Sequence, residues 1–248
     1  MWLLISLFVV LPAACQLGYW LGSRARVPKD ATEKTHAGVW QSALLALAGL
    51  LIGFTFSMAQ ARYDARKQIV LAEANDIGTT YLRTRLLDDA MGEPLRALIR
   101  HYVDARLAFA EAGGDRTLAE RLDRESGALT DEIWARVAAV ARADHSPTTA
   151  LLVQSTNEMI DAGEEHLAAI ANPLPPTVFL VLILATAVAM ASTGFVCALE
   201  GRRSVLGMMV MPLLLATVVG LTVDLAHPRV GIVRVHDPIL RRLKQSFE

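Results

Sequence analysis

The chain has 248 residues, of which 53% are hydrophobic and 20% charged, with a formal net charge of −1 at pH 7. The hydrophobic fraction exceeds that of an ordinary soluble domain, whereas the charged fraction is too high for a bundle lying wholly in lipid. The central stretch Gln60–Asn172 carries 13 Lys and Arg against 19 Asp and Glu. Because nucleic acid requires a concentrated basic surface, this acidic stretch excludes nucleic acid as a partner.

Four apolar runs without a charged side chain lie near the two ends of the chain: Met1–Leu21, Val39–Met58, Thr177–Leu199 and Val205–Val223. Each has about 20 residues, the length a helix needs to cross about 30 Å of hydrocarbon. Because no basic residue precedes the first run, we expect it to be retained and not cleaved as a signal peptide. We predict an all-α protein with four transmembrane helices in two pairs and the lipid bilayer as a partner.

The charged stretch between the two pairs predicts a soluble helical bundle inserted between the second and third spans. The first pair occupies residues 1–59, with spans at about 1–21 and 39–58. The bundle occupies 60–176, a transmembrane hairpin occupies 177–226 with spans at about 177–199 and 205–225, and 227–248 form a basic tail. Since Gln60–Lys67 strongly favours helix, we expect the second membrane helix to continue into water.

The second span carries small and polar residues at helical spacing, which fall within one narrow arc at 100° per residue: Ser42, Ala46, Gly49, Gly53, Ser57 and Gln60. We call this set the small-residue stripe. Small residues let membrane helices approach closely, so close packing is one interpretation. The alternative is a pore-facing surface, where Ser57 and Gln60 offer hydrogen bonds to a passing ion or water.

Bulky apolar residues lie on a neighbouring face of the same span: Leu45, Ile52 and Phe56, with Ala59. In a channel, such residues form a constriction that gates by dewetting. In most membrane helices an apolar face contacts lipid, which is the alternative interpretation.

No basic residue follows Arg142 in the predicted bundle, and the last predicted helix of the bundle ends in four acidic residues: Glu158, Asp161, Glu164 and Glu165. Like charges three and four residues apart repel, so a nearby group must offset them. The candidates are Arg83 or Arg85, or a divalent cation shared with Glu73 and Asp76, which share one helical face. Plain solvation is the third alternative.

The sequence carries no recognisable catalytic arrangement. The six histidines form no helical pair, and Cys15 and Cys197 have no zinc or redox spacing. No phosphate-cradling glycine loop and no nucleophile elbow is present. We therefore expect no enzyme activity, no cofactor and no resident metal centre.

Several motifs resemble a known family: Leu50–Met58 followed by Arg62-Tyr63-Asp64-Ala65-Arg66, Glu73–Thr79, Asn157–Asp161, and Val223-Asp224-Leu225 before Pro228. Together they resemble the bacterial bestrophin-like domain proteins over nearly the whole chain. Tyr63-Asp64-Ala65-Arg66 is also similar to the aromatic–acid–Ala–Arg stretch that follows the second membrane helix of bacterial bestrophins.

Bestrophins are pentameric ion channels with an apolar neck lined by the second helix. The resemblance therefore implies an oligomeric ion channel, for anions, in a bacterial inner membrane, with Ile52 and Phe56 as neck residues. The rival hypothesis is a non-conducting membrane scaffold or sensor whose acidic bundle binds a partner or a cation.

Basic residues outside the spans are divided six to eight between the two sides of the membrane. The larger number lies beside the central domain and in the tail, which favours a cytoplasmic location for both. Arg24 to Lys34 directly flank the first span and favour the reverse orientation, so both orientations stay open.

Overall fold

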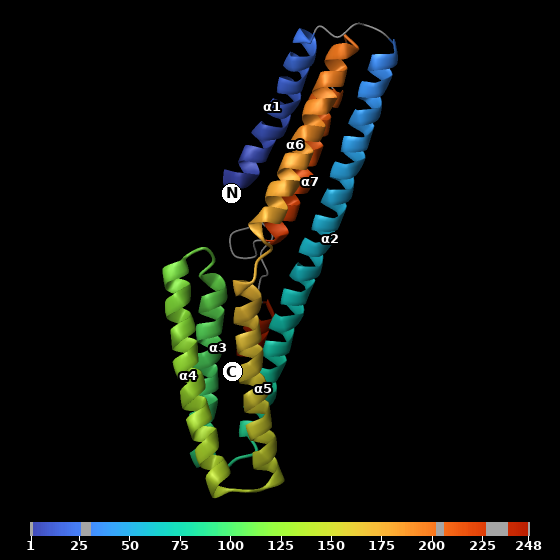
Figure 1. The fold of residues 1–248 in the computed structure, drawn as a ribbon. Helices are drawn as coiled ribbons and strands as arrows, with labels where there is room; N and C mark the ends of the chain where they lie inside the picture. The colour runs from blue at the N-terminus through green and yellow to red at the C-terminus, as the bar shows by residue number, and fades with distance from the viewer. Residues whose placement is uncertain (1, 26–30, 202–205, 227–237, 248) are drawn as a thin grey trace. The chain divides into compact units, whose positions relative to one another are not determined.

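The computed structural model describes residues 2–25, 31–201, 206–226 and 238–247, and every element in these ranges is helical (Figure 1). The elements are α1 (Trp2–Arg24), α2 (Ala31–Thr84), α3 (Asp89–Glu111), α4 (Arg116–Ala143), α5 (Pro147–Ala171), α6 (Pro176–Leu199), the π-helical turn η1 (Leu206–Val210), α7 (Met211–Ala226) and α8 (Pro238–Gln245). Four helices are long and apolar enough to cross a membrane. The prediction of an all-helical chain with four candidate spans is confirmed.

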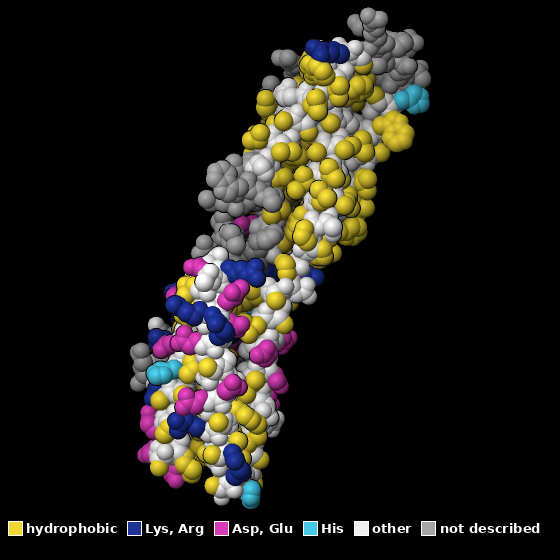
Figure 2. All heavy atoms as spheres, turned by 60° about the vertical axis from the view of Figure 1, so that its left-hand side comes forward, with side chains coloured by type: hydrophobic (Ala, Val, Ile, Leu, Met, Phe, Trp, Pro, Cys, Tyr) yellow, Lys and Arg dark blue, Asp and Glu magenta, His cyan; other side chains and the backbone are white. Residues whose placement is uncertain are grey.

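The chain divides into two compact units. Unit 1 comprises Met1–Tyr63 and Pro173–Val233, and unit 2 comprises Asp64–Asn172 and Arg234–Glu248. Helix α2 belongs to both, because its 54 residues continue without a break past Tyr63. Hydrophobic side chains cover the visible face of unit 1, whereas acidic and basic side chains are interspersed over unit 2 (Figure 2).

In unit 1, the backbones of α1 and α6 approach each other through glycines. A Cβ atom added at Gly194 on α6 would clash with the Cys15 carbonyl oxygen, and one at Gly18 on α1 would clash with Ala191. At Gly22, one turn further along α1, an added Cβ would lie 2.7 Å from the Phe195 carbonyl oxygen. Such close contacts maximise dispersion and are a main source of helix association in lipid. This pair of helices is therefore the packing centre of unit 1.

The last membrane helix begins irregularly. The π-helical turn η1 comes immediately before α7, and Pro212 is the second residue of α7. Proline has no N–H and its ring crowds the carbonyl four residues earlier, so a regular α-helix cannot pass through this point. A π-turn widens the helix locally and accommodates that defect.

In unit 2, α3, α4 and α5 are each begun by a capping side chain. Asp88 accepts a hydrogen bond from the Met91 N–H at 3.1 Å, and Asp115 and Ser146 accept equivalent bonds at the starts of α4 and α5. Each cap satisfies an N–H that the helix itself leaves unpaired. The apolar faces of these helices then meet in one core that also includes Ile77 and Tyr81 of α2.

The final helix, α8, is part of the unit 2 core and not a free tail. Leu240 is fully buried, and Phe247 stacks on Tyr81 of α2 with a ring-centroid distance of 3.9 Å. Lys244 pairs with Asp104 of α3 at 2.7 Å. From the sequence, residues 227–248 are predicted only as a basic tail. Residues 227–237 lie outside the described residues, whereas 238–247 complete the core of unit 2.

We expect Gly194→Ala to destabilise unit 1 by roughly 1–3 kcal/mol, because its methyl group would overlap the α1 backbone. Gly49→Ala is the matched control, since a Cβ atom there meets no heavy atom within 4 Å. Thermal unfolding of the two purified variants in detergent compares them. Equal melting temperatures for both variants would contradict the α1–α6 contact.

We expect Leu240→Ala to lower the free energy of unfolding of unit 2 by about 2–5 kcal/mol, because it empties a fully buried site. Arg242→Ala, at an exposed position of the same helix, should change it by less than about 0.5 kcal/mol. Trp134 fluorescence during denaturant unfolding reports on unit 2 once Trp2, Trp20 and Trp40 are replaced by Phe. A similar small effect for both variants would show that α8 is not docked.

Candidate functional site

The small-residue stripe lies on the outside of unit 1. Its members are exposed, apart from Gln60, which is half-buried. Gly49 and Gly53 have open space where a Cβ atom would be, so no helix of the same chain packs against them. Within this chain, close packing uses the Gly18 and Gly22 pair instead. The stripe is therefore free to face another copy of the chain or an aqueous path.

The exposed face of α2 keeps an 11-residue register along the helix. In unit 1 it includes Gly49, and in unit 2 it includes Leu71 and Leu82, which stand 22 and 33 residues later. Three turns of an α-helix take about 11 residues, so these positions recur at nearly the same angle around α2. Leu71 is 38% exposed and Leu82 is 59% exposed in unit 2. Leu71 and Leu82 are thus exposed apolar side chains on the part of α2 that belongs to unit 2.

The residues assigned to a neck do not share the exposure of the stripe. Ile52 is only 7% exposed and packs in the core of unit 1 with Ala48 and Leu11. Phe56 is half-buried against a second apolar cluster that contains Ala59. Its side chain is therefore packed among this chain's own helices, and its assignment to a neck stays a prediction. Phe56 has a partly exposed ring.

The family-like motif lies where α2 passes from unit 1 to unit 2. Arg62 and Tyr63 are half-buried, Asp64 is exposed and Arg66 is buried. Tyr63 packs against the apolar cluster that contains Ala59, Phe179 and Val223. Arg62, Asp64 and Arg66 each take part in polar or electrostatic contacts. Of these four residues, only Asp64 is exposed.

A buried polar cluster, formed by Glu73, Arg106 and His166, lies inside unit 2. Glu73 of α2 has no exposed side-chain surface, and its two oxygens face different partners. Arg106 Nε of α3 donates to Glu73 Oε1 at 2.5 Å, and His166 Nδ1 of α5 lies 2.6 Å from Glu73 Oε2. Burial disfavours the charged carboxylate, but the hydrogen bond from His166 and the charge of Arg106 outweigh it and lower the pKa of Glu73.

Two further groups enclose this cluster. Tyr102 packs its hydroxyl against Gly163, where a Cβ atom would lie only 2.6 Å from the hydroxyl oxygen. Burial raises the pKa of Tyr102 to about 12, so the phenol stays neutral. The Arg106 guanidinium lies 5.3 Å from the ring centre of Phe109. Arg106 is thus held by a carboxylate and an aromatic face, as buried arginines require.

Neither Arg106 nor His166 is among the site residues predicted from the sequence, although their spacing contains a signal. Arg106 follows Ile99, Tyr102 and Val103 by seven, four and three residues, which places it on the buried face of α3. His166 follows Met159 by seven residues on the buried face of α5. A charged or titratable residue on an apolar helix face predicts a buried partner. What the spacing does not give is the identity of that partner.

The predicted acidic cluster is divided in the structure. Glu73 pairs with Arg106, not with Arg83 or Arg85, whereas Glu158, Asp161 and Glu165 are exposed on α5. Partial burial, and then the charge of Glu158, raise the pKa of Asp76. Arg83 instead donates to the Leu151 carbonyl at 2.5 Å, and Arg85 lies over the Tyr81 ring. Among the described residues, no group of three or more His, Cys, Asp or Glu is placed to hold a metal ion.

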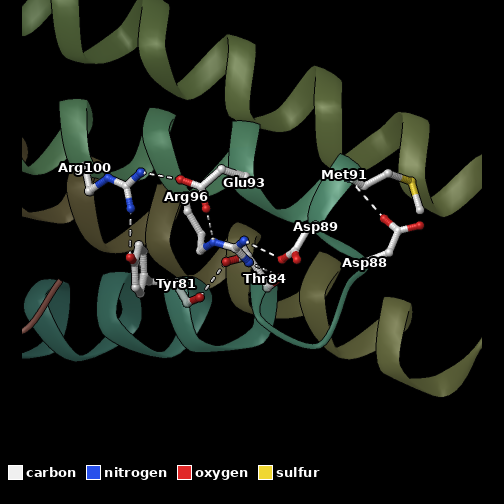
Figure 3. Close-up of polar contacts among 8 residues, drawn as sticks. All are labelled: Tyr81, Thr84, Asp88, Asp89, Met91, Glu93, Arg96 and Arg100. Carbon is white, nitrogen blue, oxygen red and sulfur yellow. Dashed lines mark hydrogen bonds and ion pairs between the residues drawn. The ribbon is translucent and has the colours of Figure 1, made fainter. Parts of the chain in front are cut away.

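A second polar network stabilises the turn between α2 and α3 (Figure 3). Arg96 donates to Glu93 at 2.8 Å and to Asp89 at 3.1 Å. Arg100 bridges Glu93 at 2.7 Å and the Tyr81 hydroxyl at 3.0 Å, as Figure 3 shows. Because Glu93 and Asp89 are exposed, these ion pairs contribute little free energy and mainly fix the geometry of the turn.

A family model described as the Bestrophin-like domain matches residues 9–239, nearly the whole chain. The chain belongs to the bestrophin-like domain family. This confirms the resemblance inferred from the motifs in the sequence. No curated protein sequence matches the chain.

Solved structures share the fold of this bestrophin-like protein. A single-substitution variant of a bacterial bestrophin homologue from Klebsiella pneumoniae matches with a TM-score of 0.70 at 11% identity, covering 98% of this chain and 97% of that one. Another structure of a bacterial bestrophin homologue from Klebsiella pneumoniae gives 0.66 at 13% identity, with coverages of 98% and 95%. A variant of a membrane protein gives 0.63 at 14% identity, with coverages of 98% and 93%. At such identities the similarity is one of fold.

We expect Glu73→Gln to destabilise this bestrophin-like protein by about 3–5 kcal/mol at neutral pH, because it leaves the Arg106 charge buried without its carboxylate. The pKa of Glu73 is lower in the folded chain, so its stabilisation is complete above the unfolded value and lost as pH falls through the folded value. The difference in free energy of unfolding between the wild type and Glu73→Gln should therefore become smaller as the pH falls.

Glu120→Gln, which disrupts an exposed pair with Arg116, is the control and should have an effect below about 1 kcal/mol. Denaturant unfolding near neutrality and near pH 3 measures both variants. A gap for Glu73→Gln that stays constant with pH would contradict the lowered pKa of Glu73.

Proposed function

We propose that the protein is an oligomeric ion channel of the bacterial inner membrane, with the small-residue stripe of α2 facing the axis of the oligomer. The observation that carries the proposal is the exposure of this stripe, which contacts no helix of its own chain at Gly49 and Gly53. Membership of the bestrophin-like domain family and the fold similarity to bestrophin homologues support it.

The chemistry of the exposed face favours contact with further copies of this chain. A membrane helix that faces lipid gains nothing from glycines and hydroxyls, whereas a helix that faces another helix or a water-filled path does. In unit 2, Leu71 and Leu82 expose apolar area on the same register, and covering that area is favourable.

We assign anions as the permeating species. The stripe from Ser42 to Gln60 contains no carboxylate, and the hydroxyl of Ser57 and the amide of Gln60 donate hydrogen bonds that suit an anion. Phe56, whose ring is partly exposed beside the stripe, is the neck residue that we retain.

The proposed topology has four crossings, with unit 2 inserted between the second and third. Helix α8 belongs to unit 2, although the apolar helices α6 and α7 lie between it and α5 in sequence. If α6 and α7 each cross the membrane once, the chain returns to the side on which α5 ends. Helix α8 can then join α5 in unit 2. The basic residues of unit 2 and α8, including Arg241 and Lys244, favour the cytoplasm as that side.

We expect the purified protein to conduct anions in planar bilayers, and Ser57→Cys to make the current sensitive to a negatively charged thiosulfonate reagent. Cys15 and Cys197 are first replaced by Ala, so that the new thiol is alone. Modification should lower the current by more than about half, because it places bulk and negative charge on the axis. Leu184→Cys, exposed on α6, is the matched control and should be insensitive.

Three outcomes would contradict the channel. One is the absence of conductance in both the wild type and Phe56→Ala. Another is equal sensitivity of Ser57→Cys and Leu184→Cys, which would remove the stripe from the axis. The third is a monomer on chemical cross-linking in membranes. The first and third results together favour a non-conducting scaffold.

A further inference from the structure

A narrow apolar groove runs between α2 and α6 on the outside of unit 1. It has a volume of about 280 Å³. All of its lining is apolar and comes from these two helices: Leu44, Leu47, Val181, Leu184, Ala185 and Val188. The leucine and valine side chains at 47, 181, 184 and 188 are all exposed. The groove is thus an open apolar surface on the described part of unit 1.

The groove lies at membrane depth and away from the small-residue stripe. It is formed by the parts of α2 and α6 that carry no charged side chain, residues 39–58 and 177–199. At 100° per residue, Leu44 and Leu47 lie on the opposite side of α2 from Ser42, the first residue of the stripe. In a bilayer the material around such a surface is hydrocarbon.

Two exposed tryptophans indicate where the lipid headgroups lie relative to the groove. Trp20, near the end of α1, is 47% exposed, and Trp40, near the start of α2, is 70% exposed. Tryptophan is enriched at the membrane–water interface, because its ring is apolar whereas its N–H needs a polar partner. The Arg24 guanidinium lies 3.8 Å from the ring centre of Trp20. Because a guanidinium stays charged and is costly in hydrocarbon, this ring must lie within reach of the headgroups.

The two tryptophans lie at the same level, because both helices contact the same turn of α6. Gln41, which follows Trp40, donates from its amide to the Thr193 hydroxyl at 3.3 Å. Gly194, the next residue of α6, lies so close to α1 that an added Cβ would be 2.8 Å from the Tyr19 backbone nitrogen. Tyr19 directly precedes the other tryptophan. One membrane surface therefore passes through this level of unit 1.

We propose that the groove holds an acyl chain of a phospholipid whose headgroup lies at the level of Trp20 and Trp40. Along α2, Leu44 lies one turn and Leu47 two turns beyond Trp40, which is about 6 Å and about 10 Å further into the hydrocarbon. At these depths a phospholipid presents its acyl chain and not its headgroup. The proposal concerns the outer face of unit 1 and holds whether or not the protein conducts.

The walls of the groove favour a flexible chain over a helix from a second copy. Membrane helices associate through small residues that let their backbones approach. Among the six lining residues, all of them described, Ala185 is the only small one. A helix with its side chains is about 10 Å wide, whereas an acyl chain bends to fill a narrow space and gains dispersion contacts along its length.

Fluorescence quenching of the full-length protein in phosphatidylcholine vesicles tests what covers this face. Trp2, Trp20 and Trp134 are replaced by Phe, so that Trp40 is the remaining tryptophan. The vesicles contain phosphatidylcholine with a nitroxide either close to the headgroup or deep in the acyl chain. We expect the shallow nitroxide to quench Trp40 about twofold more strongly than the deep one. With Trp40 also replaced by Phe, Leu47→Trp should show the reverse order, because it lies about 10 Å deeper.

Native mass spectrometry of the purified protein, with phosphatidylcholine added to the detergent, tests whether the groove retains a lipid. We expect the wild type to keep bound phosphatidylcholine. Ala185→Leu extends a side chain into the groove and should lower the lipid-bound fraction at least about twofold. Ala13→Leu, which adds the same bulk at an exposed position of α1 outside the groove, is the matched control and should leave the fraction unchanged.

Each measurement can overturn the proposal. If neither nitroxide quenches Trp40 or Leu47→Trp, another protein chain covers this face. Equal lipid retention by the wild type and Ala185→Leu, or an equal loss in Ala13→Leu, would show that the groove is not a lipid site. If a substituted groove prevents folding, the native Trp40 still decides, since stronger quenching by the deep nitroxide would remove the headgroup from this level.

Discussion

Hydrocarbon offers no hydrogen-bond partner to a peptide group, and this constraint determines most of what the chain can be. Every N–H and C=O of a membrane segment must be satisfied within the segment, so each span is helical. The same constraint explains why the disturbance before Pro212 takes the form of a π-turn and not a break. It also explains the glycines of α1 and α6, since lipid supplies no hydrophobic drive and close backbone contact must take its place.

Unit 2 follows a different pattern, because charged side chains are interspersed over its surface and its helices bury their apolar faces in one core. Within that core the chain nevertheless retains a carboxylate, a guanidinium and an imidazole. Removing such charges from water is costly, and apolar residues of similar volume would serve stability as well or better. The cluster is therefore best understood as an arrangement that fixes which faces of α2, α3 and α5 meet.

Much of this architecture could be predicted from the sequence, because the relevant signals are local. Uncharged runs of membrane length gave the four spans, and the helix-favouring stretch after Gln60 gave the continuation of α2. Contacts between distant segments were not readable. Gly18-x-x-x-Gly22 and Gly49-x-x-x-Gly53 have the same pattern, and only the position of α6 shows which pair is packed. For the same reason, sequence spacing left Ile52 open to a pore or to lipid, and only the positions of the other helices show that it is buried.

For the polar residues, too, contacts between distant segments could not be predicted from the sequence. Arg83 and Arg85 were expected to offset the acidic residues of the last bundle helix, and Glu73 was expected only to share a cation with them. The partner of Glu73 is Arg106, 33 residues away on another helix. Helix α8 was missed because eight residues with three basic side chains resemble a solvated tail. Its role depends on where Leu240 and Phe247 are placed, which sequence spacing alone does not reveal.

The position of α8 has a consequence for how the protein is made. The core of unit 2 is built from residues on both sides of α6 and α7 in sequence, so it cannot close when α5 leaves the ribosome. Until both apolar helices and then α8 have been synthesised, Tyr81 and the surface around Gly78 remain uncovered. Completion of the core of unit 2 is thus tied to the synthesis of α6, α7 and α8. A chain arrested before α8 would carry an open apolar surface, the kind of signal by which chaperones and proteases distinguish unfinished proteins.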